Sequence, residues 1–338
     1  MLPSIQINTG VTLVKLHRRN VLQLAAGAAA LPALSRTALA LDYPVRPVRV
    51  IVYFAAGGGN DIIARLMGQW LSERLGQQFA VENRPGGGGN IGTEAVVRAA
   101  PDGYTLLLIS SPNTTNATLY DHLNYDFLRD IAPVASISRE PNVMVVNPSV
   151  PAKTVPEFIA YAKANPGKIN YASAGIGSSQ HMSGEMFKMT AGIEMVHVPH
   201  RGTAPALQSL LGGEVQVMFA SMPASLEFVR ADKLRALAIT AAARSKELPD
   251  VPTVGEFLPG YEASVFYGIG APKDTPADIV ERLNKEINAG LADSKLGARL
   301  TDLGGTPLPG SPAAFGKFLV DETDKWAKVI KFAHIKAE

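Results

Sequence analysis

The sequence predicts an α/β protein of two lobes, each built on a mainly parallel sheet. Short β-branched segments alternate with segments of helical periodicity, which is typical of βαβ units. Two such series follow one another along the chain. The chain has 338 residues, which is above the length at which a single hydrophobic core stops growing. Long helices without a new sheet complete the chain, and we expect them to return and cover the first lobe.

The first series begins with the strand 48–54, which stops at the glycine loop 55–59. Asn60 or Asp61 is placed to cap the helix that follows. Further along, the predicted elements are a strand at 79–82, a glycine loop at 85–90, a short helix to residue 100 and a buried strand at 106–109.

The second series and the final helices follow from the same patterns. Its predicted strands are 143–146, 169–172, 195–198, 215–219 and 234–239, and its helices are 155–165, 179–190 and 204–211. Thr203 is placed to cap the last of these helices. A strand at 263–271 leads to helices at 276–292, capped by Thr275, then 294–303 and 311–330.

The first forty residues have the features of an export signal. They contain no acidic residue, and they carry the pair Arg18–Arg19, the apolar run 21–34 and the small-residue site 38–40. That apolar run is too short to span a bilayer. We therefore expect cleavage after Ala40 and export, by the twin-arginine route for folded proteins or by the general route. An unprocessed N-terminal segment is the alternative.

Composition restricts the classes of function. Residues 1–40 hold four of the 32 Lys+Arg and none of the 30 Asp+Glu, so the remaining chain has a net charge of −2. No basic domain remains to neutralise phosphates, and nucleic acid is not expected as a partner. Cysteine is absent, which excludes disulfides, cysteine–metal sites and thiol catalysis. No other apolar stretch is long enough to cross a membrane, so we expect a soluble mature protein.

Loops of small and hydroxylic residues follow several predicted strands. In open α/β sheets, ligands bind beyond the carboxyl ends of the strands. Glycine allows a ligand to approach backbone N–H groups, and helix N-termini favour anions. These loops therefore predict a site that holds a carboxylate-sized anion through neutral donors; ordinary βα turns are the alternative. They are 55–61, 110–113, 173–179, 199–203 and 220–221.

Other chemistries have weaker support. The segment Gly87–Gly92 matches G-x-G-x-x-G, the motif of nicotinamide dinucleotide-binding enzymes, which is a further alternative. It follows the second strand, however, and Asp102 lies in a turn rather than at the end of a further strand. His197 and His200 point to opposite faces of a strand and have no third ligand nearby, so we expect no metal site. No nucleophile elbow or zinc-protease motif occurs, and we expect no cofactor and no catalytic residue. Arg201 is either a carboxylate partner or a solvated charge.

Three segments resemble the Bug receptors, the extracytoplasmic solute-binding proteins of tripartite tricarboxylate transporters. They are residues 52–65, 82–92 and 101–106, and 178–187, 198–206 and 251–255 are similar as well. The resemblance extends over residues 43–332. It implies a type II periplasmic-binding-protein fold, in which two α/β lobes joined by two crossing strands close on a ligand. The implied division is an export signal at 1–40, lobe 1 at 41–140 plus 265–338 and lobe 2 at 141–264.

The resemblance also implies the site. One carboxylate would be held between the loop 54–61 of lobe 1 and the loop 174–179 of lobe 2, partly through water, with Thr203 and its neighbours completing the pocket. The expected ligand-binding residues are Phe54, Ala55, Ala56, Gly57, Gly58, Asn60, Asp61, Ser110, Ser111, Ala174, Gly175, Ser178, Ser179, His181, His200, Gly202, Thr203, Ala220 and Ser221.

Two departures from the family pattern bear on the ligand. Ala220 and Ser221 stand where the family often has an acidic residue and an amide, and His200 stands where an aromatic residue is common. Losing an acid disfavours a ligand ammonium group, so we expect a di-acid, an aromatic acid or a keto acid rather than a cationic amino acid. The resemblance implies a periplasmic, monomeric receptor without catalytic activity that delivers its ligand to a membrane permease. A receptor feeding a sensor kinase and an exported hydrolase or isomerase are the alternatives.

Overall fold

The computed structural model describes residues 43–332 and 334–337. The predicted export signal and its cleavage site lie outside the described residues. From Pro44 onward the chain forms one compact unit, and the description below concerns this unit.

Two parallel arrays of strands form the centres of the two lobes. In the first lobe, β1 (Val48–Val52) pairs in parallel with β2 (Phe79–Asn83) on one side and β3 (Thr105–Ile109) on the other. In the second lobe, β5 (Asn170–Ser173) has the same relation to β6 (Val196–Pro199) and β7 (Val217–Ser221). Parallel pairing through intervening helices confirms the predicted βαβ organisation.

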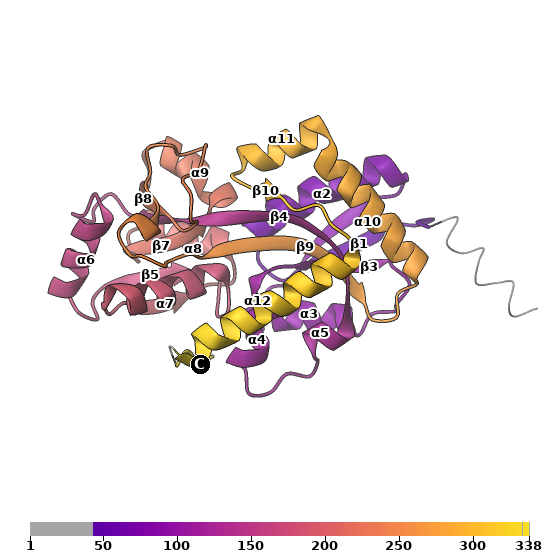
Figure 1. The fold of residues 1–338 in the computed structure, drawn as a ribbon, viewed down its shortest axis with the longest axis horizontal. Helices are drawn as coiled ribbons and strands as arrows, with labels where there is room; N and C mark the ends of the chain where they lie inside the picture. Colours follow the sequence, from indigo (N-terminus) through magenta and orange to yellow (C-terminus); the bar gives the residue numbers. More distant parts are fainter. Residues whose placement is uncertain (1–42, 333, 338) are drawn as a thin grey trace, which may run out of the picture. The chain divides into compact units, whose positions relative to one another are not determined.

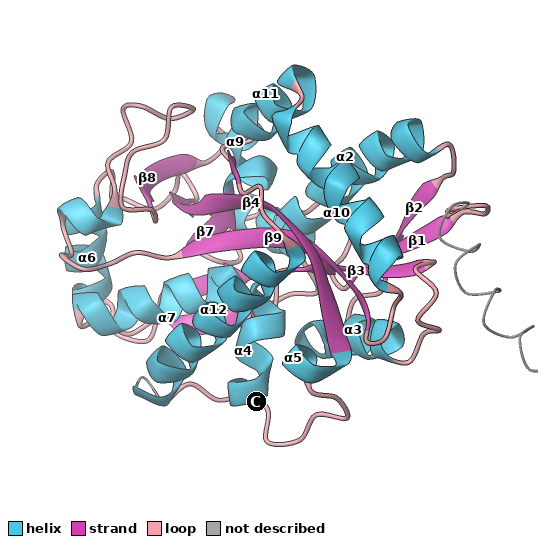
Figure 2. Ribbon diagram, turned by 45° about the vertical axis from the view of Figure 1, so that its right-hand side comes forward, coloured by secondary structure: helices cyan, strands magenta, loops and turns pink. Residues whose placement is uncertain are grey.

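Two antiparallel strands connect these arrays. The 16-residue strand β4 (Ile131–Val146) pairs with β9 (Ser264–Pro272) up to Pro141, and from Asn142 it pairs with β7 and with β8 (Arg235–Ile239). Figure 2 shows β4 and β9 running side by side between the two groups of helices. The change of pairing strand lies next to the lobe boundaries expected from the sequence, 140/141 and 264/265. We propose these boundaries as the division between the lobes.

The first part of β4 was not expected from the sequence, which predicted a strand only at 143–146. Pro133 and Pro141 interrupt the β-branched pattern, and proline cannot donate to a ladder hydrogen bond. The structure accommodates the irregularity with register shifts between Pro133 and Ala135 and between Ser136 and Ser138. Pro141 lies where the pairing of β4 changes from β9 to β7. The backbone N–H donor that Pro141 lacks is therefore missing at the point where the neighbouring strand changes.

Helices cover both faces of the strands (Figure 1). In the first lobe they are α2 (Gly59–Leu75), η1 (Gly87–Gly89), α3 (Asn90–Val97), α4 (Ser111–Leu119) and α5 (Phe127–Asp130). In the second lobe they are α6 (Val155–Ala164), α7 (Ser179–Ala191), α8 (Thr203–Leu211), α9 (Met222–Arg230) and η2 (Val254–Glu256). The chain continues with α10 (Ala277–Ala292), α11 (Ser294–Asp302), the short strand β10 (Thr306–Pro307) and α12 (Pro312–Phe332).

The final helices return to the first lobe, as predicted. The ring N–H of Trp70 in α2 donates to the backbone oxygen of Glu286 in α10 at 2.8 Å. Helix α12 goes further than expected: Phe315 and Leu319 belong to the hydrophobic core of the first lobe, whereas Trp326 and Ile330 belong to a core of the second. One helix therefore contributes to both lobes.

Several helix caps differ from those predicted. Helix α2 is capped by Gly58 rather than by Asn60 or Asp61, α8 by Gly202 rather than by Thr203, and α10 by Pro276 rather than by Thr275. None of these three caps uses a side-chain hydrogen bond. At the first two positions a glycine carries the turn because a neighbouring lobe leaves no room for a side chain.

Candidate functional site

The glycine loop before α2 lies directly against the second lobe. The backbone N–H of Ala55 donates to the backbone oxygen of Arg201 at 2.9 Å. A Cβ atom added to Gly58 would lie 3.1 Å from the Thr203 Cβ, and one added to Gly202 would lie 2.8 Å from the Ala55 nitrogen. We call this contact, between residues 54–59 and residues 200–204, the interlobe seam.

A side chain makes a second bond across the seam region. Thr115, on α4 of the first lobe, donates its hydroxyl to the backbone oxygen of Gly177 in the second lobe at 2.8 Å. A Cβ atom added to Gly177 would lie 2.9 Å from that hydroxyl oxygen. The lobes are thus hydrogen-bonded to each other at two separate places.

Asp61 shapes the glycine loop from within its own lobe. Its carboxylate accepts hydrogen bonds from the backbone of Gly57 at 3.0 Å, from Asn83 at 3.0 Å and from Arg65 at 2.9 Å. Burial alone would raise the pKa of Asp61, but the bonds from Arg65, Gly57 and Asn83 outweigh it and lower that pKa below its usual value. The carboxylate is therefore ionised and already paired, which makes it an organiser of the loop.

The opposing loop of the second lobe is held in a similar way. Ser178 caps α7, accepting from the backbone of His181, and donates its hydroxyl to the backbone oxygen of Gly175 at 2.7 Å. Gln180 joins this loop to the seam: its oxygen accepts from the backbone of Ala174 at 2.7 Å, and its amide nitrogen donates to the Thr203 hydroxyl at 2.8 Å. The Ser178 proton is thus engaged within the loop in this conformation.

A stack of three aromatic rings packs next to that loop. The rings of His181 and His197 stack with centroids 4.0 Å apart, and Tyr171 stacks on His197 at 4.8 Å. Burial lowers the pKa of each histidine to about 3, so both rings are neutral and stack without charge repulsion. His181 Nδ1 accepts from the backbone of Gly177 at 3.2 Å. His181 therefore positions the loop from beneath.

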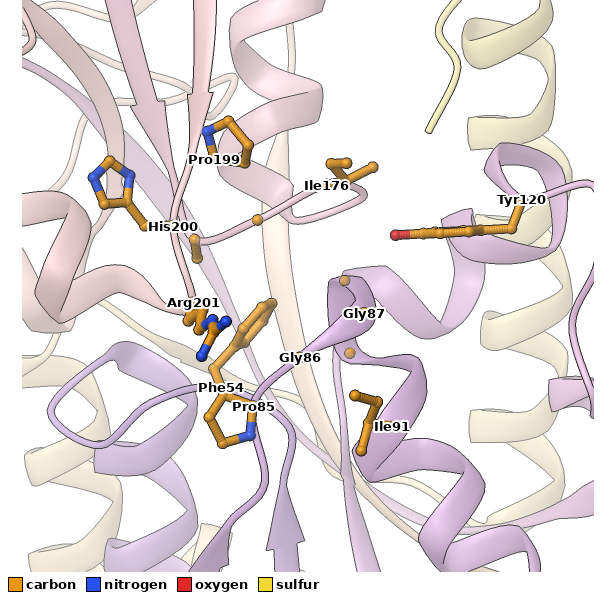
Figure 3. Close-up of a pocket in the computed structure, with 14 residues that line it drawn as sticks. Phe54, Pro85, Gly86, Gly87, Ile91, Tyr120, Ile176, Pro199, His200 and Arg201 are labelled. Atoms are coloured by element: carbon orange, nitrogen blue, oxygen red, sulfur yellow. The ribbon is translucent and has the colours of Figure 1, made fainter. Parts of the chain in front are cut away.

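A cavity of about 530 Å³ opens at the outer end of the seam. Figure 3 shows Phe54, Pro85 and Arg201 on one side of it, with Tyr120 and Ile91 facing them. The remaining lining comes from residues 86–89 of the first lobe and from residues 174–176, 199 and 200 of the second. The volume is within the range of small-molecule sites, about 300–1,000 Å³.

The structure distributes the predicted site residues over three places. The cavity is lined by Phe54, Ala174, Gly175 and His200. The residues along or beside the seam are Ala55, Gly57, Gly58, Gly202, Thr203 and Ser221. Ala56 is exposed on the loop that contains Gly57 and Gly58. Asn60, Asp61, Ser110, Ser111, Ser178, Ser179, His181 and Ala220 are buried inside the lobes near these loops. In Figure 3 the His200 ring is directed away from Gly87 and Tyr120, and its Nδ1 lies 3.1 Å from the Val198 oxygen.

The sequence did not assign the second glycine run to this site. Gly86, Gly87, Gly88 and Gly89 all have positive φ, between 57° and 135°, a conformation that side chains other than glycine rarely adopt. A Cβ atom on Gly88 would lie 2.4 Å from the Tyr120 hydroxyl and 3.0 Å from the Ile176 oxygen. The run of consecutive glycines was the available signal. It reflects positive φ angles and close packing, against Ile91 and Tyr53 within the first lobe and, at Gly88, against Ile176 of the second.

A stripe of buried polar side chains lies behind the seam. Ser138, Glu140 and Asn142 share one face of β4, and the residues opposite the two ends are Tyr267 and Ser221. Atoms that find no hydrogen-bond partner in the described part of the chain include Asn60 Nδ2, Glu140 Oε2, Asn142 Oδ1, Ser221 Oγ and the Tyr267 hydroxyl. Buried polar groups without partners are unfavourable, so this arrangement suits a site that acquires further polar partners.

Glu140 is the one carboxylate of that stripe, and it is fully buried. Burial raises its pKa from the usual value of 4.5 to about 8, although the hydrogen bond from Ser138 at 3.1 Å acts in the opposite direction. At neutral pH the side chain is therefore mostly a neutral acid. It offers no negative charge to a ligand ammonium group.

Within residues 43–332 and 334–337, no group of three or more His, Asp or Glu side chains is placed to hold a metal ion. Among the same residues, no helix has the length and apolar character needed to cross a membrane.

Comparison with known proteins gives consistent results. The family model for the tripartite tricarboxylate transporter family receptor matches residues 63–335. Protein BugT of Bordetella pertussis is 38% identical over 292 residues, which are 86% of this chain and 90% of BugT.

Solved structures extend the similarity to the fold. The structure of Rpa4515 of R. palustris with adipate superposes with a TM-score of 0.85 at 37% identity, covering 87% of this chain and 99% of that one. MatC (Rpa3494) from Rhodopseudomonas palustris with bound malate gives 0.81 at 34%, covering 85% and 100%. The predicted class, two α/β lobes of the periplasmic-binding-protein type joined by crossing strands, is confirmed.

The buried carboxyl of Glu140 predicts a pH dependence of stability. Between pH 4.5 and 8 the folded chain keeps a proton on Glu140 that the unfolded chain has released. The free energy of unfolding therefore falls as pH rises through this window, by up to about 1.4 kcal/mol per pH unit, and levels off above it. Urea unfolding of wild type and Glu140→Gln at several pH values should show this slope only in wild type.

Glu281→Gln is the matched control, because Glu281 is exposed on α10. It should follow the wild-type pH profile. A Glu140→Gln protein with an unchanged profile would show that Glu140 is already ionised in the folded state.

Proposed function

Because the chain belongs to the tripartite tricarboxylate transporter receptor family, we propose that it captures a small carboxylate between its two lobes and delivers it to a membrane permease. One observation carries this proposal. The start of α2 at Gly58 has no side-chain cap and faces Thr203 of the other lobe across the seam. A helix N-terminus with accessible backbone N–H groups is a natural anion site. It is positioned here so that a bound carboxylate contacts both lobes.

The charges around the seam favour an acid over an amino acid as ligand. Asp61 is paired with Arg65, Glu140 is mostly protonated, and Ala220 on β7 carries no charge. The similar proteins Rpa4515 and MatC hold adipate and malate. We propose a di-acid as the first class to test, with aromatic and keto acids next.

Capture works by differential binding to two conformations. An open form admits the ligand to the glycine loop, and contacts from both lobes then favour closure about β4 and β9. The bonds Ala55–Arg201 and Thr115–Gly177 form only when the lobes meet, so they contribute equally to every ligand. The closed surface is what a permease would recognise. The proposed receptor is exported to the periplasm after cleavage at Ala40, acts as a monomer and catalyses no reaction.

A carboxylate screen tests the function directly. Protein refolded from denaturant, to remove retained ligand, is heated with di-acids, aromatic acids, keto acids and amino acids. At about 100 times Kd, a ligand adds roughly 2.7 kcal/mol to the free energy of unfolding, which raises the melting temperature by several degrees. Stabilisation by lysine or ornithine with no effect of any acid would contradict the proposal, and chemical change of a bound acid would point to an enzyme.

Gly58→Val tests the position of the first carboxylate. Gly58 has φ −88° and ψ 171°, which valine adopts readily, so the fold should persist. The new side chain would meet Thr203 and prevent the lobes from closing. We expect calorimetry to show a loss of affinity of about tenfold or more.

Gly310→Ala, on the approach to α12, is the control, since an added Cβ atom there makes only ordinary contacts. Normal binding by Gly58→Val would place the carboxylate elsewhere.

Thr115→Val tests the bond between the lobes separately from the ligand contacts. It preserves the shape of the side chain and removes the bond to Gly177. The affinity should fall by about two- to tenfold, the effect of one hydrogen bond, and by the same factor for every ligand, with faster dissociation in stopped flow.

Thr114→Val is the matched control, because the Thr114 hydroxyl bonds only to Ser111 within its own helix. A factor that differs from ligand to ligand would mean that Thr115 contacts the ligand itself.

A further inference from the structure

We propose that Arg201 is the second anion-binding group of the site, and that it selects dicarboxylates whose far carboxylate enters the cavity of Figure 3. This inference rests on the proposed function, because it assumes that the first carboxylate occupies the glycine loop. The ligand would be a linear acid with an apolar spacer between its two charged ends.

The charge of the cavity supports this assignment. Among the residues that line it, Arg201 carries the one permanent charge, and none is Asp or Glu. Its guanidinium forms no hydrogen bond or ion pair with the described part of the chain. The His200 ring, the other ionisable cation nearby, is turned away from the cavity. A ligand carboxylate would therefore meet one cation and no competing anion.

The backbone of Arg201 is fixed while its side chain extends along the wall. Its backbone oxygen accepts the hydrogen bond from Ala55, and the next residue, Gly202, is packed against the Ala55 backbone. In Figure 3 the guanidinium lies beside Phe54 and Pro85. The planar group can present two parallel N–H donors to a carboxylate, which is the strongest geometry that arginine offers.

The two proposed anion sites belong to neighbouring residues of one loop, Arg201 and Thr203, and the cavity beside Arg201 has apolar walls. Thr203 is two residues beyond Arg201 and faces the start of α2 at Gly58. Phe54, Pro85 and Ile176 supply apolar walls to the cavity. A methylene chain passing over these side chains would bury apolar surface and bring its second carboxylate to Arg201. A mono-acid of equal length would bury the same chain but leave Arg201 unpaired.

A cycle of ligands and variants tests the inference. Calorimetry at pH 7.5 compares α,ω-diacids of four to eight carbons with mono-acids of equal length, on refolded wild type, Arg201→Gln and Arg201→Lys. We expect Arg201→Gln to lose about tenfold or more in affinity for the best di-acid, the effect of a charge-assisted bond, and less than about twofold for its mono-acid partner. Arg201→Lys should fall between, because it keeps the charge and loses the paired donors.

Arg299→Gln on α11 is the control for net charge, since Arg299 is exposed and removed from the cavity; it should bind both acids as wild type does. Equal losses for di-acid and mono-acid, or no loss for either, would overturn the role of Arg201 while leaving the receptor function intact. Equal affinity of the wild type for mono-acids and di-acids would also overturn the role of Arg201. Failure of wild type to bind any carboxylic acid would overturn the proposed function itself.

Discussion

The backbone N–H groups at the start of α2 are the constraint on which the rest of the site depends. Gly58 caps the helix without a side chain, so no part of the loop itself supplies an acceptor there. A side chain at this position would separate the lobes, because Thr203 lies too close. The same feature that lets the lobes meet therefore places the start of α2, the proposed anion site, at the seam. Asp61 stabilises the glycine loop by accepting a hydrogen bond from the backbone of Gly57, and its charge is paired with Arg65.

Much of the fold follows from local patterns in the sequence. The strand at 48–54 and the helix after it were predictable because a β-branched run, a glycine stop and helical periodicity agree there. The strand at 106–109 was predictable from its apolar run, but the helix α4 that follows it was not predicted. The crossing strand β4 was only partly predictable, since Pro133 and Pro141 break its pattern and the neighbour that accommodates them, β9, is far away in the sequence. The helix caps were misjudged for a related reason. Asp61 and Thr203 are good caps in isolation, but contacts between loops engage both side chains elsewhere.

The candidate site was predictable in its chemistry and less so in its extent. Small and hydroxylic loops indicated neutral donors, and the structure brings the loops at Gly58 and Thr203 together. The part that escaped prediction is the wall formed by residues 86–89 and Tyr120. Its glycines matched a dinucleotide motif, but the structure explains them by their positive φ and by close packing against Ile91, Tyr53 and, at Gly88, Ile176 of the other lobe. The role of Arg201 could not be predicted either, because the sequence alone does not reveal whether its guanidinium has an ion-pair or hydrogen-bond partner.

Helix α12 gives the molecule a third link besides the two strands. Its first half is anchored by Phe315 and Leu319 in one core, and its second half by Trp326 and Ile330 in the other. Helix α12 has 21 residues, and after the proline at its start its sequence has no further proline at which a sharp kink would form. A large movement of one lobe away from the other would therefore have to remove the Trp326 side chain from the core of the second lobe. In the proposed opening motion, this packing would limit how far the lobes separate, so residues distant from the ligand would influence the rate of capture.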